Sequence, residues 1–184
     1  MISTSTYIAT SLDGFIARKD GSIDWLIEAN AAIPQGEDCG YSEFMRTVDV
    51  LVMGRNTYEQ AASFPSWPYK GRRVIVLTSR SVQFRQGQDI WLEESREAPH
   101  DLLKRLSSEG CRHAYIDGGK VIQSFLSCGL LEKITVTIIP VLIGEGRALF
   151  GNVPEDIEME LINSKAFDFG FLQATYLVRS IAPK

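Results

Sequence analysis

Apolar residues along the chain fall into strand-length runs that alternate with segments of helical periodicity. Residues 48–53 and 74–77 are nearly continuous apolar runs, which is the pattern of strands covered on both faces. Further strands are predicted at residues 4–10, 89–92 and 114–116, with a second apolar patch at 15–17 after the Asp13-Gly14 turn signal. Helices are predicted over residues 24–30, 41–47, from Thr57 onward, 99–109 and 121–128.

The last third of the sequence changes character. Residues 134–143 form a long β-branched run that Pro140 interrupts. Because proline in a sheet is confined to an edge strand, a strand start or a bulge, we expect an edge or interface strand there. Residues 159–166 and 171–178 resemble a closing antiparallel pair. Strand–helix alternation followed by an antiparallel tail predicts an α/β fold with a mixed sheet, and the lack of repeats or linkers predicts one domain over residues 1–184.

Composition and charge narrow the class of protein. The 184 residues are 45% hydrophobic and carry a net charge of −4, so nucleic acids and anionic membrane surfaces are poor candidate partners. No apolar run reaches the ~18 residues of a spanning helix, and the N-terminus lacks a secretory signal, so we expect a cytoplasmic protein. Three cysteines without paired spacing fit reduced thiols, and the two histidines give no support to a metal site or a catalytic triad.

Three predicted strand ends carry groups suited to an anionic dinucleotide. Gly54-Arg55-Asn56-Thr57 leads a buried strand into a helix start, where free N–H groups favour phosphate. Thr78-Ser79-Arg80 offers two hydroxyls and a guanidinium, which suit a 2′-phosphate. Gly118-Gly119-Lys120-Val121 follows another strand, and glycine lets backbone approach a pyrophosphate. Each segment taken alone is equally an ordinary capped helix or turn, but ligands of open α/β sheets bind beyond the carboxyl ends of strands.

The familiar nucleotide motifs are missing from the sequence. Gly144-Glu145-Gly146 lacks the third glycine and the following helix of a dinucleotide fingerprint, and Gly119-Lys120 is followed by Val121 instead of the Ser or Thr of a P-loop. A nucleotide hydrolase is therefore disfavoured, because its expected base, metal ligands and P-loop are missing.

These strand ends, together with residues 7–17 and 140–146, resemble the dihydrofolate-reductase superfamily. The likeness is strongest to the branch that contains the reductase domain of the bifunctional riboflavin-biosynthesis deaminase/reductase, and it covers nearly the whole chain. It implies a three-layer α/β/α fold with a central twisted mixed β-sheet. It also implies NADPH as cofactor and a homodimer that pairs through the region of residues 134–143.

The resemblance also implies roles for single residues. Ala9, Ile16 and Ala17 would line the nicotinamide end; Gly54, Arg55 and Thr57 would hold the pyrophosphate; Thr78, Ser79 and Arg80 would meet the 2′-phosphate; and Gly118, Gly119, Lys120 and Val121 would complete the cradle. Asp117, before the paired glycines, would border the substrate.

The expected activity is hydride transfer from NADPH to a small heterocyclic, imine or carbonyl substrate, most like that of 5-amino-6-(5-phosphoribosylamino)uracil reductase. Asp117, Asp24 and Glu43 are candidate proton donors, and Trp25 with Asp117 would contact the substrate. The helical carboxylate that anchors the pterin of true dihydrofolate reductases has no clean counterpart. A divergent dihydrofolate or pteridine reductase and a non-catalytic NADPH-binding dimer therefore stay open as alternatives.

Overall fold

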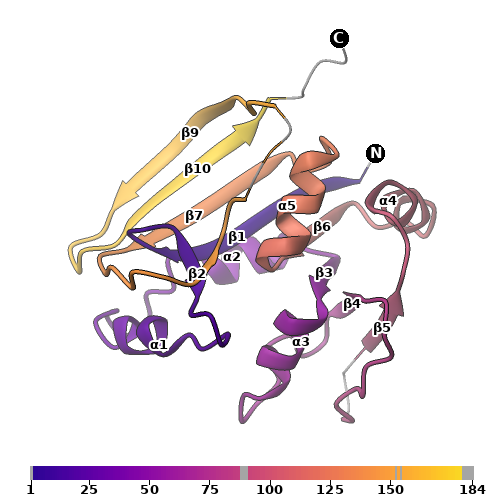
Figure 1. Ribbon diagram of the computed structural model, residues 1–184, viewed down its shortest axis with the longest axis horizontal. Coiled ribbons are helices and arrows are strands. Elements are labelled where there is room, and N and C mark those ends of the chain that lie inside the picture. Colours follow the sequence, from indigo (N-terminus) through magenta and orange to yellow (C-terminus); the bar gives the residue numbers. More distant parts are fainter. Residues whose placement is uncertain (1, 88–90, 152, 154, 180–184) are drawn as a thin grey trace.

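The computed structural model describes residues 2–87, 91–151, 153 and 155–179. Its main sheet has eight strands in the order β5-β4-β3-β6-β1-β7-β10-β9, so that β5 and β9 form the two edges (Figure 1). The strands are β1 (Ser3–Ser11), β3 (Val50–Gly54), β4 (Arg73–Leu77), β5 (Trp91–Ser95), β6 (His113–Asp117), β7 (Lys133–Ile139), β9 (Met159–Ala166) and β10 (Leu172–Val178). Six neighbouring strands from β5 to β7 run parallel, whereas β10 is antiparallel to β7 and to β9. The sheet is therefore mixed.

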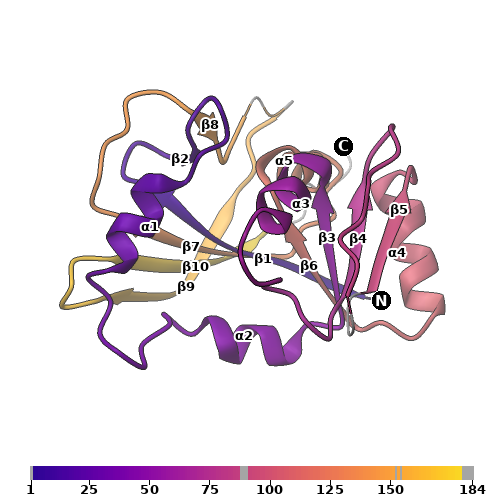
Figure 2. The same cartoon turned by 90° about the horizontal axis from the view of Figure 1, so that it is seen from below.

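Helices cover both faces of this sheet. On one face, α4 (Pro99–Ser108) and α5 (Gly119–Ser127) bury Leu106 and Phe125 against the apolar side chains of the parallel strands. On the other face, α2 (Tyr41–Thr47) and α3 (Arg55–Ala62) pack with Leu51 and Met53 of β3. Figure 2 shows α2 and α5 on opposite sides of the sheet. α1 (Asp24–Asn30) adds a third cluster around Trp25. The predicted three-layer α/β/α fold is confirmed.

The sheet divides near its centre. β1 pairs with β6 only from Ser3 to Ser5, whereas β1 continues to Ser11 beside β7 and β6 continues to Asp117 beside β3. The carboxyl-terminal halves of β1 and β6 therefore have no ladder between them.

Several expected element bounds need correction. The run 134–143 is a strand only to Ile139, because Pro140 has no N–H to donate, and β7 lies inside the sheet between β1 and β10. The helix expected from Thr57 already begins at Arg55, with Gly54 as N-cap. The strand expected at 89–92 is β5 at Trp91–Ser95, and Asp89 and Ile90 lie outside the described residues.

A two-stranded sheet escaped prediction. It joins β2 (Phe15–Ala17) to β8 (Arg147–Ala148), and two residues are too short to show a strand pattern. Within the described residues, no helix is long and apolar enough to cross a membrane.

Candidate functional site

The three strand ends expected to bind a dinucleotide are neighbours in the sheet. Gly54 pairs with Leu77, so the end of β3 lies beside Thr78 at the end of β4. Met53 pairs with Asp117, so the same strand end lies beside Gly118 on its other side. Because β3, β4 and β6 are parallel, all three turns emerge on the same side of the sheet, where these strands have their carboxyl ends. The geometric condition for a shared ligand is therefore met.

Glycine contacts draw these turns still closer together. A Cβ atom on Gly118 would overlap the hydroxyl of Thr57 at the start of α3, and a Cβ on Gly54 would lie 3.3 Å from Val121 of α5. A Cβ on Gly119 would lie 3.0 Å from Ile16 of β2. Gly118 also has φ 87° and ψ 134°, a backbone region that is essentially restricted to glycine. The turns after β3 and β6 thus pack against one another, with β2 beside them.

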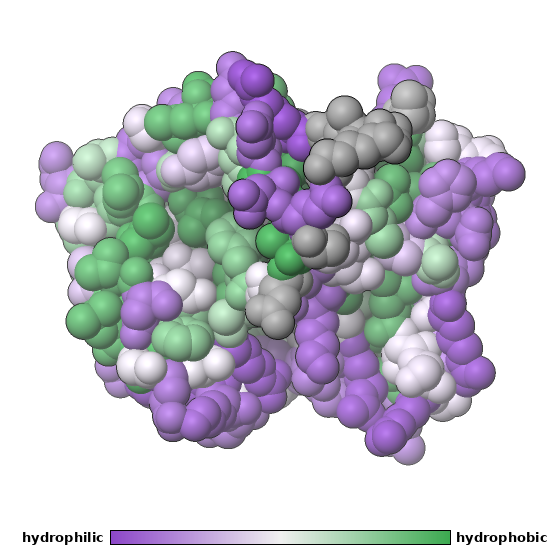
Figure 3. Space-filling model, turned by 45° about the horizontal axis from the view of Figure 1, so that its top comes forward, coloured by the Kyte–Doolittle hydropathy of each residue, from purple (hydrophilic) through white to green (hydrophobic). Residues whose placement is uncertain are grey.

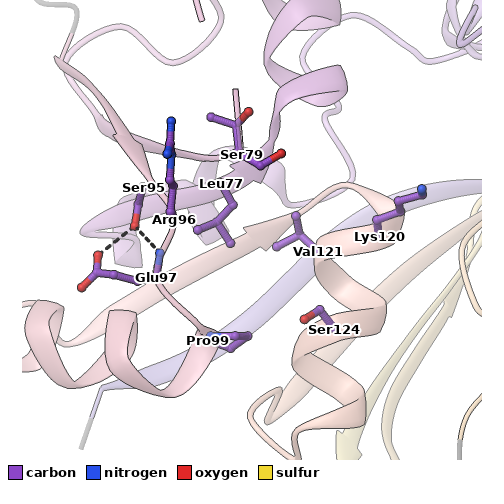
Figure 4. Close-up of a pocket in the computed structure, with 10 residues that line it drawn as sticks. Leu77, Ser79, Ser95, Arg96, Glu97, Pro99, Lys120, Val121 and Ser124 are labelled. Atoms are coloured by element: carbon purple, nitrogen blue, oxygen red, sulfur yellow. Dashed lines mark hydrogen bonds between the residues drawn. The ribbon is translucent and has the colours of Figure 1, made fainter. Parts of the chain in front are cut away.

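A cavity of about 320 Å³ opens between the ends of β4 and β5 and the first turns of α5 (Figure 4). It has two hydroxyls after β4, two cationic side chains and an apolar floor, and its one carboxylate, that of Glu97, is neutralised by an ion pair with Arg105 outside the lining. The lining residues are Leu77, Thr78, Ser79, Ser95, Arg96, Glu97, Pro99, Lys120, Val121 and Ser124. We call this the β4–α5 cavity. The N-terminal end of α5 adds its positive dipole end, so the cavity suits an anion.

Arg96 lines this cavity although sequence reasoning did not name it, whereas Arg80 is not among the lining residues, and its predicted contact with the 2′-phosphate stays a prediction. Arg80 is exposed beyond the cavity, and its backbone N–H and C=O are bonded to the Thr78 hydroxyl in a tight turn (3.1 and 2.8 Å). Arg96 follows β5 directly, and the next residue, Glu97, is fixed by the Ser95 hydroxyl at 2.8 Å (Figure 4). The sequence would have pointed to Arg96 only if β5 had been predicted to end at Ser95, because Arg96 would then have been the first residue after a strand.

A second cavity, of about 640 Å³, lies on the opposite face of the sheet. Its walls come from β1, β7, α1 and the loop before α2, and its apolar surface is interrupted by a few polar groups. The lining residues are Tyr7, Ile8, Ala9, Leu26, Asn30, Ile33, Pro34, Gln35, Gly36, Glu37, Asp38, Cys39, Tyr41, Thr137, Ile139 and Phe171. We call this the β1–α2 cavity. It contains Ala9, which was expected at the nicotinamide end.

Asp117 is buried at the carboxyl end of β6, next to the split in the sheet. Its carboxylate accepts hydrogen bonds from the Gly118 N–H at 2.8 Å and the Tyr69 hydroxyl at 3.3 Å. Burial raises the pKa of Asp117 to about 6, and these two hydrogen bonds oppose that shift. The residue lines neither cavity and is only 8% exposed. Its predicted catalytic and substrate-binding role stays a prediction.

Other expected site residues lie apart from the two cavities. Asp24 accepts a hydrogen bond from Arg18 at 2.7 Å, which lowers the pKa of Asp24 to about 2 and suits a fixed anion better than a proton donor. Glu43 is exposed on α2 and lines neither cavity. Trp25 is 3% exposed and packs in the core behind the β1–α2 cavity. Arg55 forms an ion pair with Glu59. Ala17 is buried in β2.

Comparison with known proteins agrees with this arrangement. The RibD C-terminal domain family model matches residues 5–172. The chain is 35% identical over 167 residues to the uncharacterized protein YwjB of Bacillus subtilis (strain 168), covering 89% of this chain and 91% of that relative.

Solved structures show the same fold. A structure named "Putative riboflavin biosynthesis protein" from Shewanella sp. PV-4 matches with a TM-score of 0.88 and 35% identity, over 97% of this chain and 99% of that one. Dihydrofolate reductase from Enterococcus faecalis, complexed with NADP(H) and RAB-propyl, matches with a TM-score of 0.61 and 18% identity, over 97% of each chain, and shares the fold. With its split mixed sheet and its match over nearly the whole length, the chain belongs to the RibD C-terminal domain family, and it shares the fold of dihydrofolate reductase.

Proposed function

We propose that the chain is an NADPH-dependent reductase that transfers hydride to a small heterocyclic, imine or carbonyl compound. The observation that carries the proposal is the placement of two cavities on opposite faces of the sheet, on either side of the three converging turns. The β4–α5 cavity is anion-binding in character, whereas the β1–α2 cavity is largely apolar. This division suits a phosphorylated cofactor end and a reaction chamber, respectively.

The residues of the β4–α5 cavity fit the phosphorylated end of NADPH. Thr78 and Ser79 supply hydroxyl donors, and Arg96 and Lys120 supply charge. The three strand spacings from β4 to β1 amount to ~14 Å, so one extended dinucleotide laid over Gly54 and Gly118 would reach from this cavity to the split. When bound, NADPH supplies the hydride, and the chain supplies binding, orientation and exclusion of water.

The β1–α2 cavity would hold the substrate. Ala9 lines it from β1, and the side chains of Leu26, Ile33 and Phe171 give it apolar walls that exclude water from a reacting carbon. Asp117 lies at the split on the same sheet face as Tyr41 of this cavity, and its pKa of about 6 suits an acid that exchanges a proton near neutral pH. Membership of the RibD C-terminal domain family supports a heterocycle of the aminouracil type as the substrate.

We also propose that the protein acts as a homodimer. Because β7 lies inside the sheet, the contact between the two copies would not be formed by β7 as an edge strand. One of the two edges of the sheet is β9, all eight residues of which are exposed. Leu161 and Ile162 of β9 and Leu172 of β10 are large apolar side chains on this surface. Figure 3 shows hydrophobic surface gathered over this side of the molecule. An exposed apolar edge of this length favours pairing with a second copy.

A comparison of two arginine variants tests the proposed cofactor site. Arg96→Ala should weaken NADPH binding by roughly tenfold or more and leave NADH binding within about twofold, because a charged hydrogen bond to a 2′-phosphate contributes ~1.5–3 kcal/mol. Arg80→Ala is the matched control and should change neither affinity much. Fluorescence titration of the reduced cofactors gives both constants. Equal losses for NADPH and NADH in Arg96→Ala would contradict the site, and wild-type protein that binds neither cofactor would refute the function.

A further inference from the structure

The loop that closes the β1–α2 cavity carries fixed negative charge. Glu37 Oε1 accepts hydrogen bonds from the backbone N–H groups of Asp38 at 3.0 Å and Cys39 at 2.6 Å. The Asp38 carboxylate accepts from the N–H groups of Gly40 and Ser42, both at 2.9 Å, and its hydrogen bonds to Ser42 lower the pKa of Asp38. Both acidic residues line the cavity. Asp38 is therefore held as an anion at the start of α2.

The wall that bears these acids is anchored to the sheet. The Cys39 carbonyl accepts a hydrogen bond from the Tyr7 hydroxyl of β1 and another from the Gln173 amide of β10 at 3.0 Å. The same Gln173 nitrogen also lies within hydrogen-bond distance of the Tyr7 hydroxyl, at 2.8 Å, and of the Thr137 hydroxyl of β7, at 2.9 Å, so its two hydrogens are shared among three acceptors. Cys39 itself has φ 56°, a conformation that this network holds in place. The acidic loop is thus part of a built cavity.

Compensating positive charge is scarce around this cavity. Its lining, within the described part of the chain, includes no Lys, Arg or His. Lys165 of β9 lies 3.6 Å from Glu37 Oε2 and over the Phe167 ring, outside the lining. Lys165 against Glu37 and Asp38 leaves a net charge of about −1, and beyond the lining the opposite charges of Asp117 and Arg72, which both act on Tyr41, offset each other. Burial raises the pKa of Tyr7 to about 12, so its phenol stays neutral and donates to the Cys39 carbonyl.

From these observations we propose that the β1–α2 cavity accepts a substrate without a phosphate group, namely a planar heterocycle that is neutral or cationic. The proposal rests on the reductase function above and narrows its substrate class. A phosphate carries a charge of about −2 and requires several donors or cations, of the kind the β4–α5 cavity offers with Arg96 and Lys120. The β1–α2 cavity offers apolar walls and carboxylates instead.

Coulomb's law gives the expected difference in affinity between a phosphorylated and a phosphate-free compound. A net charge of about −1 acting on a phosphate across ~10 Å, at an effective dielectric constant of ~40, weakens binding roughly tenfold. The loss grows with closer approach and diminishes at high salt, because the loop lies near the surface.

A matched pair of probes tests the proposal. The probes are 5-amino-6-(5-phosphoribosylamino)uracil and the same compound without its phosphate, titrated by calorimetry into the NADP⁺-loaded protein. We expect the dephosphorylated probe to bind roughly tenfold tighter. Gln35→Arg adds a cation at an exposed lining position, so it should tighten binding of the phosphorylated probe alone. Gln35→Met, of similar length without charge, should leave the ratio unchanged.

The outcomes separate the two proposals. Equal or tighter binding of the phosphorylated probe to the wild-type protein would overturn the phosphate-free substrate class. The same holds if Gln35→Met alters the ratio as much as Gln35→Arg does, because charge would then not be the cause. Failure of the reductase proposal shows separately, as absence of NADPH binding in the fluorescence titration.

Discussion

Replacement of Asp117 by Asn is expected to stabilise the protein at neutral pH. The folded-state pKa of Asp117 is about 6, against an ordinary value of 3.8, because burial disfavours the carboxylate. A difference of about 2 pKa units corresponds to a cost of ~3 kcal/mol for holding the residue ionised in the folded protein. Asn keeps an oxygen that can accept from the Gly118 N–H, and its NH2 group, in the place of the second carboxylate oxygen, can donate to the Tyr69 hydroxyl oxygen. Asp117→Asn should therefore recover about 1–3 kcal/mol of this cost.

The pH dependence gives the effect its signature. Between about pH 4 and pH 6 the folded state binds the extra proton, so the contribution of Asp117 to the free energy of unfolding falls as the pH rises through this window. The gain from Asp117→Asn should therefore be full above pH 7 and nearly vanish at pH 4. Acids with lowered pKa, such as Asp24 and Asp38, are present in both proteins and cancel in the difference.

Urea unfolding of wild type, Asp117→Asn and the exposed control Asp168→Asn at pH 4, 6 and 8 measures these differences. The control should show no gain that grows with pH. A destabilised Asp117→Asn at pH 8 would refute the reasoning, since it would mean that the ionised carboxylate is stabilised by its contacts. If the variant is more stable but loses reductase turnover at pH 7, Asp117 is retained for catalysis at the expense of stability.

Two further substitutions test the packing and the assembly. Gly118→Ala should destabilise the fold and weaken NADPH binding, because the backbone conformation at Gly118 is restricted to glycine and the added Cβ would overlap Thr57. The control Gly129→Ala, at φ 64° with nothing near the added Cβ, should lower the free energy of unfolding by only about 1 kcal/mol, as measured by thermal denaturation. Leu161→Lys, at a position 54% exposed on β9, should convert the dimer to a monomer in analytical ultracentrifugation. The control Leu12→Lys replaces another exposed leucine away from β9 and should leave the dimer intact. A wild-type protein that is monomeric at micromolar concentration would contradict the dimer.

The parts of the fold that depend on local pattern were predictable from the sequence. Buried runs such as Val50–Gly54 and the hairpin strand Met159–Ala166 show their apolar character or their turn residues directly. The resemblance to a known fold then predicted that the turns after β3, β4 and β6 lie together at the carboxyl ends of neighbouring strands, and the strand order confirms this.

Features set by pairing over long separations were not predictable. Pro140 was interpreted as the mark of an edge strand, but it only ends β7, and the interior place of β7 depends on β10 far along the chain. Arg96 was missed because the short, polar strand before it has no apolar period, which placed the strand end several residues too early. The acidic wall of the β1–α2 cavity depends on Gln173, which lies 134 residues from Cys39 in the sequence.

The central strand β1 has an unusual composition at the split where the proposed site lies. A strand covered on both faces is expected to be apolar, yet β1 buries Thr4, Ser5, Thr6, Thr10 and Ser11. Ser5 bonds His113 at 2.6 Å where β6 is still paired, whereas the Thr6 hydroxyl, just beyond the last pair, is fully buried without a hydrogen-bond partner in the described structure. Such a group costs ~1–3 kcal/mol. A core optimised for stability alone would not carry such a group, so its presence at the split suits a site that receives a polar ligand or water there.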